Sequence, residues 1–512
     1  MKLTKKILLK RSGQVLLSLL LIALLALAWS DYQLNVTSGG YVKVISPENL
    51  YSSYHKLAIR NAQILTPDCS HFIRGQQVLL EDGKIISLQT DSIPISGYEI
   101  IDAQGQFLIP GLIDSHVHLK ESKNDLCLYL ANGVTYVREM TGTQSHLDWK
   151  QEINQGALGP NLYVASRKIN SEAGFDGVYD SWTRNRINIG TPKAVKKELQ
   201  QLREAGYDAL KMSTFLNREV YDAITEQAKE IQLPVIGHIP FSVGLDTALF
   251  SGQTEFAHVE EITKSIMWAY GGYGKDNAQA FLSHLDSLSD KIAIQIRERG
   301  IAVTTTIWLM ESLPQQKFNT EAFTKQIPMP YANPALIEGS RFRKGWLPVN
   351  NSYAEPNEVL QNPERRAASK VFWETYVEAI HIMTRALAKH DVVLLAGTDA
   401  NTTLTVPGFS LHDELASMVQ LGLSPQEVLY SATVAPSIWM QSNTGKIEAG
   451  YQADLVLLSE NPLLDIEHTR SVETVFRGSH WLSKAQITEL LDLVKVNNDQ
   501  EREVELGPYL AD

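Results

Sequence analysis

Short apolar runs alternate with amphipathic segments from about residue 109 to residue 440. The amphipathic segments have helical spacing, as in residues 191–206, where Val195 and Leu199 recur on one face behind an N-terminal Thr-Pro pair. The apolar runs have the length of buried strands. They are GLIDSHVH (111–118), GVTYVREM (133–140), NLYVASRKI (161–169), DALKMS (208–213), LPVIGHI (233–239), TEFAHVEE (254–261), AVTTTIWL (302–309) and VVLLAGTDA (392–400). Eight strands, each followed by helical sequence, predict an α/β fold, a (β/α)8 TIM barrel, with a doubly wound open sheet as the alternative.

The two ends of the chain carry shorter runs that resemble half-buried strands. One set lies between residues 57 and 101, and a similar texture returns in residues 445–458 and 473–482. Because chain ends commonly lie close together, both sets are expected in one small, discontinuous β-sandwich-like domain. The predicted organisation is a composite β domain of residues 57–108 and 441–485, a barrel of residues 109–440 and a C-terminal tail of residues 486–512.

Two connections are too long for simple turns. They are residues 166–190 after the third strand and residues 310–370 after the seventh. Both should emerge where active sites form on a barrel, so they are candidate lids or substrate walls. A surface excursion with no part in the site is the alternative for the second.

The first 30 residues differ from the rest of the chain. A basic stretch, MKLTKKILLKR, runs into the apolar stretch VLLSLLLIALLALAW of residues 15–29. Fifteen apolar residues fall short of the roughly 20 that span a bilayer, and Ala26-Leu27-Ala28 has the form of a cleavage site. A cleaved signal peptide is favoured over an uncleaved anchor with a cytoplasmic basic flank. Both predict an exported protein, periplasmic or otherwise extracytoplasmic, and the anchor would attach it to the inner membrane.

The net charge limits the class of partner, and the cysteine count limits disulfide bonding. The formal charge is -12, which argues against nucleic acid and leaves a small molecule as the expected partner. The chain has two cysteines, Cys69 and Cys127, which permit one bridge, although two unpaired thiols are favoured. The sequence leaves the oligomeric state open.

Candidate metal ligands recur at strand ends. His116 and His118 lie one residue apart at the end of the first strand, so both side chains point to the same face. Two imidazoles in one space suit a divalent metal ion. The ends of strands four, five, six and eight add Lys211, His238, His258 and Asp399. All six side chains should converge at one mouth of the barrel.

Lys211 needs a change of charge to act as a ligand, because an ordinary lysine with a pKa of about 10.4 stays protonated. Carboxylation by carbon dioxide would create a carbamate able to bridge two cations. His116, His118 and Asp399 would hold one cation, and His238 and His258 the other. A salt bridge at the strand end is the alternative for this lysine.

These motifs resemble the amidohydrolase superfamily, within it the imidazolonepropionase-like and prolidase-like branch. The resemblance runs through FLIPGLIDSHVH, DALKMS, VIGHIP, EFAHVEE and LLAGTDA to TGKIEAGYQADLVLLSENPLLDI, over roughly residues 57–482. It implies the same six metal-site residues, with Lys211 carboxylated in binuclear members. It also implies that Asp399 handles the proton of the attacking water.

The resulting prediction is a metal-dependent amidohydrolase that cleaves a carbon–nitrogen bond of a small molecule, an amide, cyclic amide or dipeptide-like compound, by a metal-bound hydroxide. Zinc is the expected metal, and manganese or iron would also suit these ligands. Two alternatives remain: a catalytically silent exported binding protein on the same barrel, and a mononuclear deaminase, whose relatives generally lack the bridging lysine.

Substrate contacts stay unassigned by the sequence. Phe241 stands where the prolidase-like branch often has a tyrosine, which puts dipeptidase activity in doubt. Five residues could face the pocket, but a salt bridge or a packed loop aromatic is favoured for each: Arg138, Glu139 and Arg167 near strand ends, and Tyr331 and Trp346 in the long excursion. His412 is expected to cap or orient a neighbour of the site rather than to bind metal.

Overall fold

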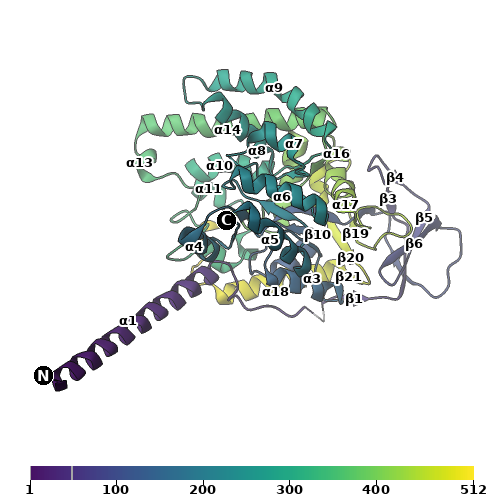
Figure 1. Ribbon diagram of the computed structural model, residues 1–512. Helices are drawn as coiled ribbons and strands as arrows, with labels where there is room; N and C mark the ends of the chain where they lie inside the picture. The colour runs from purple at the N-terminus through teal and green to yellow at the C-terminus, as the bar shows by residue number, and fades with distance from the viewer. Residues whose placement is uncertain (1, 48–49, 512) are drawn as a thin grey trace.

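A computed structural model describes residues 2–47 and 50–511 of the chain. Helix α1 (Lys2–Val36) projects from the body as a single rod, and the rest of the chain forms the body (Figure 1). Gly13–Val36 of this helix is long and apolar enough to cross a membrane, with a mean hydropathy of 2.1. The apolar helix is therefore longer than the fifteen residues counted in the sequence.

The expected strands form two parallel sheets. One has the order β11-β10-β9 and the other β13-β12-β14-β15-β16-β17-β18. The strands are β9 (Leu112–Val117), β10 (Val134–Glu139), β11 (Asn161–Val164), β12 (Ile169–Asn170), β13 (Ile187–Asn188), β14 (Leu210–Met212), β15 (Val235–Gly237), β16 (Glu255–Phe256), β17 (Ala302–Thr304) and β18 (Leu394–Leu395). All eight predicted runs contain a strand, but each strand is shorter than its run.

Isolated pairings link the two sheets at both edges. Ala165, just after β11, pairs in parallel with Ala209, and Val117 of β9 pairs in parallel with Ala400. A backbone hydrogen bond from Ser115 to Ala396 adds to the second link. The structure thus has two arcs of parallel strands with sparse links between them, and not the single continuous eight-stranded sheet that the sequence analysis expected.

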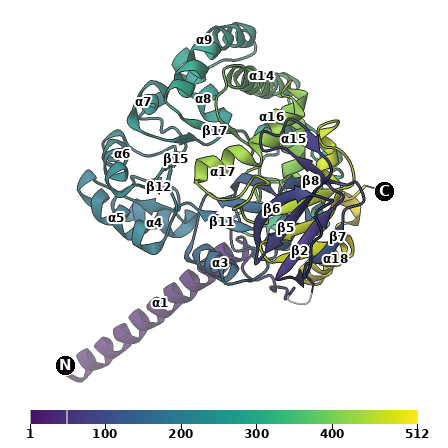
Figure 2. The same cartoon turned by 90° about the vertical axis from the view of Figure 1, so that its right-hand side faces the viewer.

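Helices cover the outside of these sheets (Figure 2). They carry the apolar stripes that the sequence analysis found, with Val195, Leu199, Leu285 and Ile292 buried. The helices are α2 (Asp125–Ala131), α3 (Gln144–Asn154), α5 (Pro192–Ala205), α6 (Arg218–Ile231), α7 (Gly244–Ser251), α8 (Val259–Tyr270), α9 (Ala278–Glu298), α14 (Pro363–Lys389), α15 (Phe409–Gln420), α16 (Pro425–Ser431) and α17 (Val434–Met440).

Strands from both chain ends pair with one another. One sheet has the order β1-β21-β20-β19-β8-β3-β4 and a second β6-β5-β2-β7. Buried residues of both sheets, including Leu57, Val78 and Leu455, share one apolar cluster. The strands are β1 (Ser52–Ser53), β2 (Lys56–Arg60), β3 (Gln63–Leu65), β4 (Phe72–Ile73), β5 (Gln76–Glu81), β6 (Lys84–Thr90), β7 (Glu99–Asp102), β8 (Phe107–Pro110), β19 (Leu455–Leu458), β20 (Val472–Arg477) and β21 (His480–Ser483).

The long connections are structured. Residues 166–190 contain β12, α4 (Gly174–Arg184) and β13. After β17 come α10 (Ile307–Phe318), α11 (Thr320–Thr324), η1 (Met329–Tyr331), α12 (Pro334–Glu338) and α13 (Asn357–Leu360). Two short 3-10 helices follow later, η2 (Ile466–Arg470) and η3 (Gly507–Tyr509). The stretch expected as a tail begins within α18 (Lys484–Glu501), which buries Leu490 and Val494. Cys69 and Cys127 are both buried and unpaired, as favoured.

Candidate metal centre

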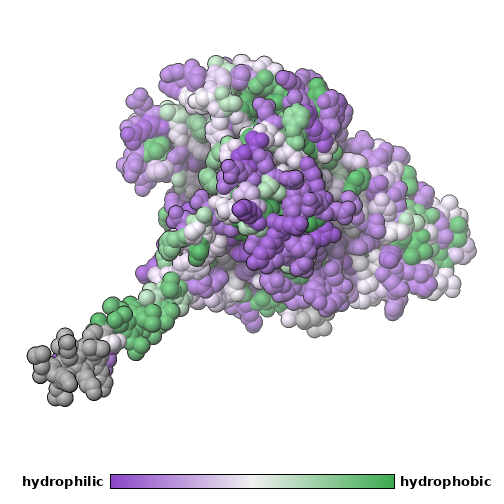
Figure 3. Space-filling model, viewed as in Figure 1, coloured by the Kyte–Doolittle hydropathy of each residue, from purple (hydrophilic) through white to green (hydrophobic). Residues whose placement is uncertain are grey.

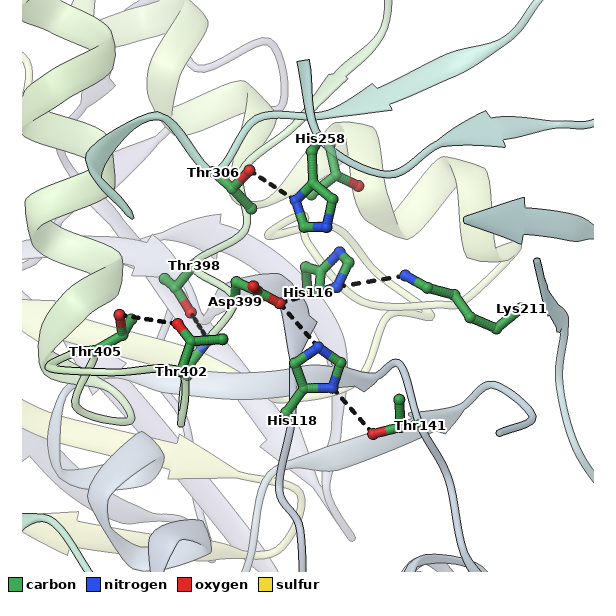
Figure 4. Close-up of polar contacts among 12 residues, drawn as sticks. His116, His118, Thr141, Lys211, His258, Thr306, Thr398, Asp399, Thr402 and Thr405 are labelled. Atoms are coloured by element: carbon green, nitrogen blue, oxygen red, sulfur yellow. Dashed lines mark hydrogen bonds and ion pairs between the residues drawn. The ribbon is translucent and has the colours of Figure 1, made fainter. Parts of the chain in front are cut away.

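The six candidate ligands converge beyond the carboxyl ends of the parallel strands, and Figure 4 shows five of them: His116, His118, Lys211, His258 and Asp399. Asp399 Oδ1 lies 2.9 Å from His118 Nε2 and 3.2 Å from His116 Nε2. His116 Nε2 lies 3.4 Å from Lys211 Nζ. The ring of His258 lies 4.4 Å from that of His116 and 5.5 Å from that of His238, measured between centroids. Side chains from five strand ends, separated by nearly three hundred positions in sequence, therefore share one space.

Hydrogen bonds fix which ring nitrogen faces this space in three of the four histidines, His118, His238 and His258. The Thr141 hydroxyl donates to Glu139 at 2.9 Å, so toward His118 Nδ1, 3.0 Å away, it accepts a proton. His118 Nδ1 is thus a donor, and in the neutral ring Nε2 carries the lone pair.

Hydrogen bonds orient the imidazoles of His258 and His238 in the same way. The Thr306 hydroxyl donates to the Thr305 carbonyl at 2.8 Å and accepts from His258 Nδ1 at 2.8 Å. The Glu261 carboxylate accepts from His238 Nδ1 at 3.0 Å. Both histidines therefore use Nδ1 as the donor, the arrangement by which protein groups orient metal-bound imidazoles.

The donor set fits a divalent cation. His118 Nε2 lies 2.9 Å from the carboxylate oxygen of Asp399, a contact that either a proton on Nε2 or a cation between the two atoms would account for. One ligand atom each from His116, His258 and Asp399 lie within 4.8 Å of one another. The buried His116 Nδ1 has no hydrogen-bond partner within the described residues. Imidazole and carboxylate are the ligands that zinc and related metals prefer.

Lys211 is fully buried at the centre. Within the described residues it forms no ion pair with a carboxylate, so the alternative of a strand-end salt bridge finds no support. Burial, with the nearby charge of Lys168, lowers the pKa of Lys211 to about 7. Gly237 lies against its side chain, since an added Cβ there would stand 3.0 Å from Lys211 Cδ.

The backbone at the centre is strained. His258, Thr306 and Asp399 all have positive φ, at 76°, 53° and 57°. Non-glycine residues in this region cost free energy and cluster at functional sites. Gly397 leaves room beside His116, because an added Cβ would stand 2.9 Å from its backbone nitrogen.

Burial also sets the charges of the ligands. It lowers the pKa of His238 to about 4 although Glu261 opposes this, and it lowers the pKa of His116 and His258 well below the usual value. Burial would raise the pKa of Asp399, but His118 and His258 outweigh it and hold that pKa low. The lowered pKa values of His116, His238 and His258 favour neutral imidazoles, and that of Asp399 favours the carboxylate, which are the forms that bind metal.

A cavity of about 400 Å³ opens over the His118 and Asp399 side of the centre. Its lining contains five cationic side chains but only two carboxylates, those of Glu121 and Asp399. Tyr353, from the long excursion, also lines it. The cationic residues are Lys120, Lys168, Arg184, Arg186 and Arg343. In a chain of net charge -12 this local excess of positive charge favours an anionic ligand.

Most residues for which a structural role was favoured lie away from the cavity. Arg138 is fully buried and pairs with Glu255, and Arg167 contacts Asn185 at 3.2 Å. Tyr331 stacks on Phe409 with ring centroids 5.0 Å apart.

Two of the remaining residues, Glu139 and Trp346, lie close to His118, and His412 lies apart from the ligands. Glu139 holds Thr141 behind His118, and Trp346 lines an adjoining cavity of about 230 Å³ with His118 and Lys120. His412 Nδ1 contacts Thr469 at 2.8 Å, and no hydrogen bond joins it to a candidate ligand within the described residues.

Sequence reasoning missed the residues that position the ligands. Glu261 follows His258 by three residues, and the sequence run TEFAHVEE contains it, but nothing in that run links it to His238. Thr141, Thr306 and the cavity residues Lys168 and Tyr353 carried no motif. Their roles arise from packing between elements, which a single sequence does not display.

Comparisons with known proteins identify the family of this chain. Residues 107–482 match the Amidohydrolase family. A dihydroorotase of Streptococcus pneumoniae is 25% identical over 453 residues, which cover 84% of this chain and 93% of the relative. A dihydroorotase of Pelobacter propionicus is 29% identical, but the alignment covers 36% of this chain and 42% of the relative.

Solved structures show the same fold. A bottromycin amidohydrolase has a TM-score of 0.67 at 18% identity, over 90% of this chain and 96% of that chain. A prolidase complexed with N-methylphosphonate-L-proline has a TM-score of 0.61 at 15% identity, over 84% of this chain and 99% of that chain.

Fold and site together define a hydrolase of carbon–nitrogen bonds in small molecules, as the sequence analysis predicted. The chain belongs to the amidohydrolase family, whose members are generally metal-dependent.

Proposed function

We propose that this protein hydrolyses a small, anionic amide with two divalent metal ions, zinc by preference, held at the converging strand ends. The single observation that carries the proposal is the convergence of the six side chains on one centre, where His118 Nε2 and Asp399 Oδ1 lie 2.9 Å apart. His116, His118 and Asp399 would bind one ion, and His238 and His258 the other. When bound, the ions would lower the pKa of a water molecule and polarise the scissile carbonyl.

We propose that Lys211 is carboxylated and bridges the two ions. Its fully buried amine has no carboxylate partner in the described residues and lies 3.4 Å from His116 Nε2. A buried ammonium without a counter-charge is costly. Addition of carbon dioxide to the amine, with release of one proton, replaces it with an anion that suits a site for cations.

The chain's own residues then move the proton. Asp399 is ionised and faces both histidines of the first strand, so it is placed to accept the proton of the attacking water and return it to the departing nitrogen. Thr141, Thr306 and Glu261 hold the imidazoles in place, so that the ligands need little reorganisation during the reaction.

The cationic lining supports an anionic substrate, such as an acylated amino acid or a carboxylated cyclic amide. Lys168 lines the cavity and forms no ion pair within the described residues, so its ammonium group is available to a carboxylate. Dipeptides remain less favoured, because Phe241 offers no hydroxyl.

We further propose how the parts are arranged. The two parallel arcs would be the halves of one (β/α)8 barrel of residues 109–440, and residues 57–108 and 441–485 would form one β domain. The catalytic body would lie outside the cytoplasm. The retained anchor is preferred over a cleaved signal peptide, because α1 continues unbroken through Ala26–Ala28 into the segment that contacts the body.

The test compares Lys211 of the centre with Lys168 of the cavity beside it. The full chain is purified, stripped with a chelator and reloaded with zinc, and metal content and hydrolysis of N-acyl amino acids and carboxylated cyclic amides are measured. We expect two zinc ions per chain and a mass increase of one carbon dioxide, lost in Lys211→Met. Lys168→Met should keep the metal and raise KM. A folded wild-type chain that binds no zinc under these conditions would contradict the proposal.

A further inference from the structure

Helix α4 packs with its polar face against the body of the protein, at β12 and β13. Asp180 is buried and accepts hydrogen bonds from Asn170 at 3.0 Å and Asn188 at 3.1 Å. The opposite face is apolar and exposed. It consists of Phe175 (81% exposed), Val178 (68%), Tyr179 (54%) and Trp182 (38%).

This spacing of three, four and seven residues makes one continuous stripe along the helix. In a water-soluble body an amphipathic helix turns such a stripe to the core. A stripe that faces outward in this way marks a surface covered by something else.

The end of α1 contacts this helix directly. The Trp182 indole donates a hydrogen bond to Asp31 Oδ1 at 3.1 Å. Asp31 is the first acid of α1 and lies two residues, about 3 Å along a helix axis, after Trp29, the last residue of the apolar stretch 15–29. Trp182 therefore lies at the level where α1 would leave the hydrocarbon layer, the depth at which Trp and Tyr side chains gather in membrane proteins.

Other groups at the same rim have the composition of a membrane interface. Trp29 of α1 packs against Phe342 with ring centroids 5.5 Å apart, and Arg341 lies 6.0 Å from the Trp29 ring. Arg343 donates to the Thr183 carbonyl of α4 at 2.8 Å. Aromatic rings and basic side chains together suit the headgroups of anionic lipids. Figure 3 shows hydrophobic surface on the body beside the point where α1 joins it.

We propose that α4 lies in the headgroup region of the membrane that α1 crosses, with Phe175, Val178, Tyr179 and Trp182 in contact with lipid. The inference rests on the proposed retention of α1 as an anchor. Arg184 and Arg343 line the catalytic cavity, and Ser38, just beyond α1, lines it too. The mouth of the cavity therefore faces the bilayer surface, where amphiphilic anions gather.

Site-specific quenching tests the proposal. Full-length chain is reconstituted in vesicles of phosphatidylethanolamine and phosphatidylglycerol, with a fluorophore on Val178→Cys. Lipids brominated near the headgroup should quench it several-fold more than a fluorophore on Leu464→Cys. Leu464 is 80% exposed and follows β19, which lies across the body from α4 (Figure 1). Unmutated chain gives the background, which should be small because Cys69 and Cys127 are buried.

A third labelled position distinguishes failure of the α4 placement from failure of the α1 anchor. Leu21→Cys, 58% exposed on α1, reports whether the anchor is in the bilayer. Quenching at Leu21→Cys but equal, weak quenching at Val178→Cys and Leu464→Cys would overturn the placement of α4 and leave the anchor intact. Absence of quenching at Leu21→Cys would overturn both. Energy transfer between Val178→Cys labels on two chains, without lipid quenching, would assign the stripe to a second copy and also overturn the proposal.

Discussion

At the scale of single residues, the side chains that orient the candidate ligands should affect zinc affinity as well as the ligands themselves. Glu261 accepts from His238 Nδ1 at 3.0 Å and from the Ile239 backbone at 2.9 Å. Glu261→Gln keeps only one acceptor, so we expect zinc affinity to fall on the order of 10-fold. Competition with a chelator measures this. Glu260→Gln on the same helix is the control, because Glu260 contacts Tyr376 and no ligand, and equal losses in both variants would refute the role.

Asp399 is the residue on which turnover should depend most. Asp399→Asn cannot accept a proton, and we expect kcat to fall by roughly 10²–10⁴-fold. Zinc content is measured on the same samples, so that loss of metal and loss of proton transfer are told apart. Unchanged turnover with full zinc content would contradict this role, and a wild-type chain without turnover whose ligand binding survives Asp399→Asn would favour the catalytically silent binding protein.

Glu414 predicts a pH dependence of stability. Burial raises the pKa of its carboxyl from the usual 4.5 to about 8, although it accepts from the Ile307 and Trp308 backbones at 2.9 and 2.8 Å. Between these pKa values the unfolded chain releases a proton that the folded chain keeps, so this group lowers stability as pH rises from about 5 to 8. Relative to wild type, Glu414→Gln should gain melting temperature steadily over that window. A constant difference from pH 5 to 8 would contradict the raised pKa.

At the scale of elements, a buried ion pair ties two strands together. Arg138 of β10 pairs with Glu255 of β16, both fully buried, and the guanidinium lies 4.3 Å from the Trp439 ring. Arg138→Met leaves Glu255 charged and unpaired, which should cost about 3–5 kcal/mol of unfolding free energy. Arg138→Met/Glu255→Leu should recover most of that loss, as chemical denaturation can measure. A double variant no more stable than the single one would argue against an uncompensated charge.

The convergence of the ligands at the strand ends was predictable, because the two-residue period of a strand and the order of the parallel strands can both be recognised in the sequence. His116 and His118 share a face by the period of two, and strand ends of parallel sheets meet at one edge. The run at residues 302–309 shows the limit of this reasoning. Its apolar pattern suggested one strand, but Thr306 adopts a left-handed conformation, at φ 53°, and helix α10 begins at Ile307. A single sequence does not reveal that break, since Thr rarely adopts this conformation.

The sequence shows that the connections after the third and seventh strands are long, but not which surfaces they form. Arg186 and Arg343 come from the two long connections and meet at one cavity, although their sequence neighbourhoods share no motif. Helix α4 is amphipathic, and amphipathicity alone predicts that its apolar face is buried. Its reversed orientation depends on Asn170 and Asn188, which flank it in β12 and β13 and capture Asp180. Such a contact between polar side chains has no periodic signature.

At the scale of the whole molecule, charge predicts the orientation across the membrane. Five basic residues precede the apolar run, Lys2, Lys5, Lys6, Lys10 and Arg11, and the first acid is Asp31. Because such a basic flank stays in the cytoplasm, the body should face the other side. A membrane-impermeant protease added to spheroplasts of an expressing bacterium should digest the body, while a cytoplasmic marker survives. Replacing the five basic residues with glutamate should reduce that digestion, and a wild-type body protected as well as the marker would rule out this topology.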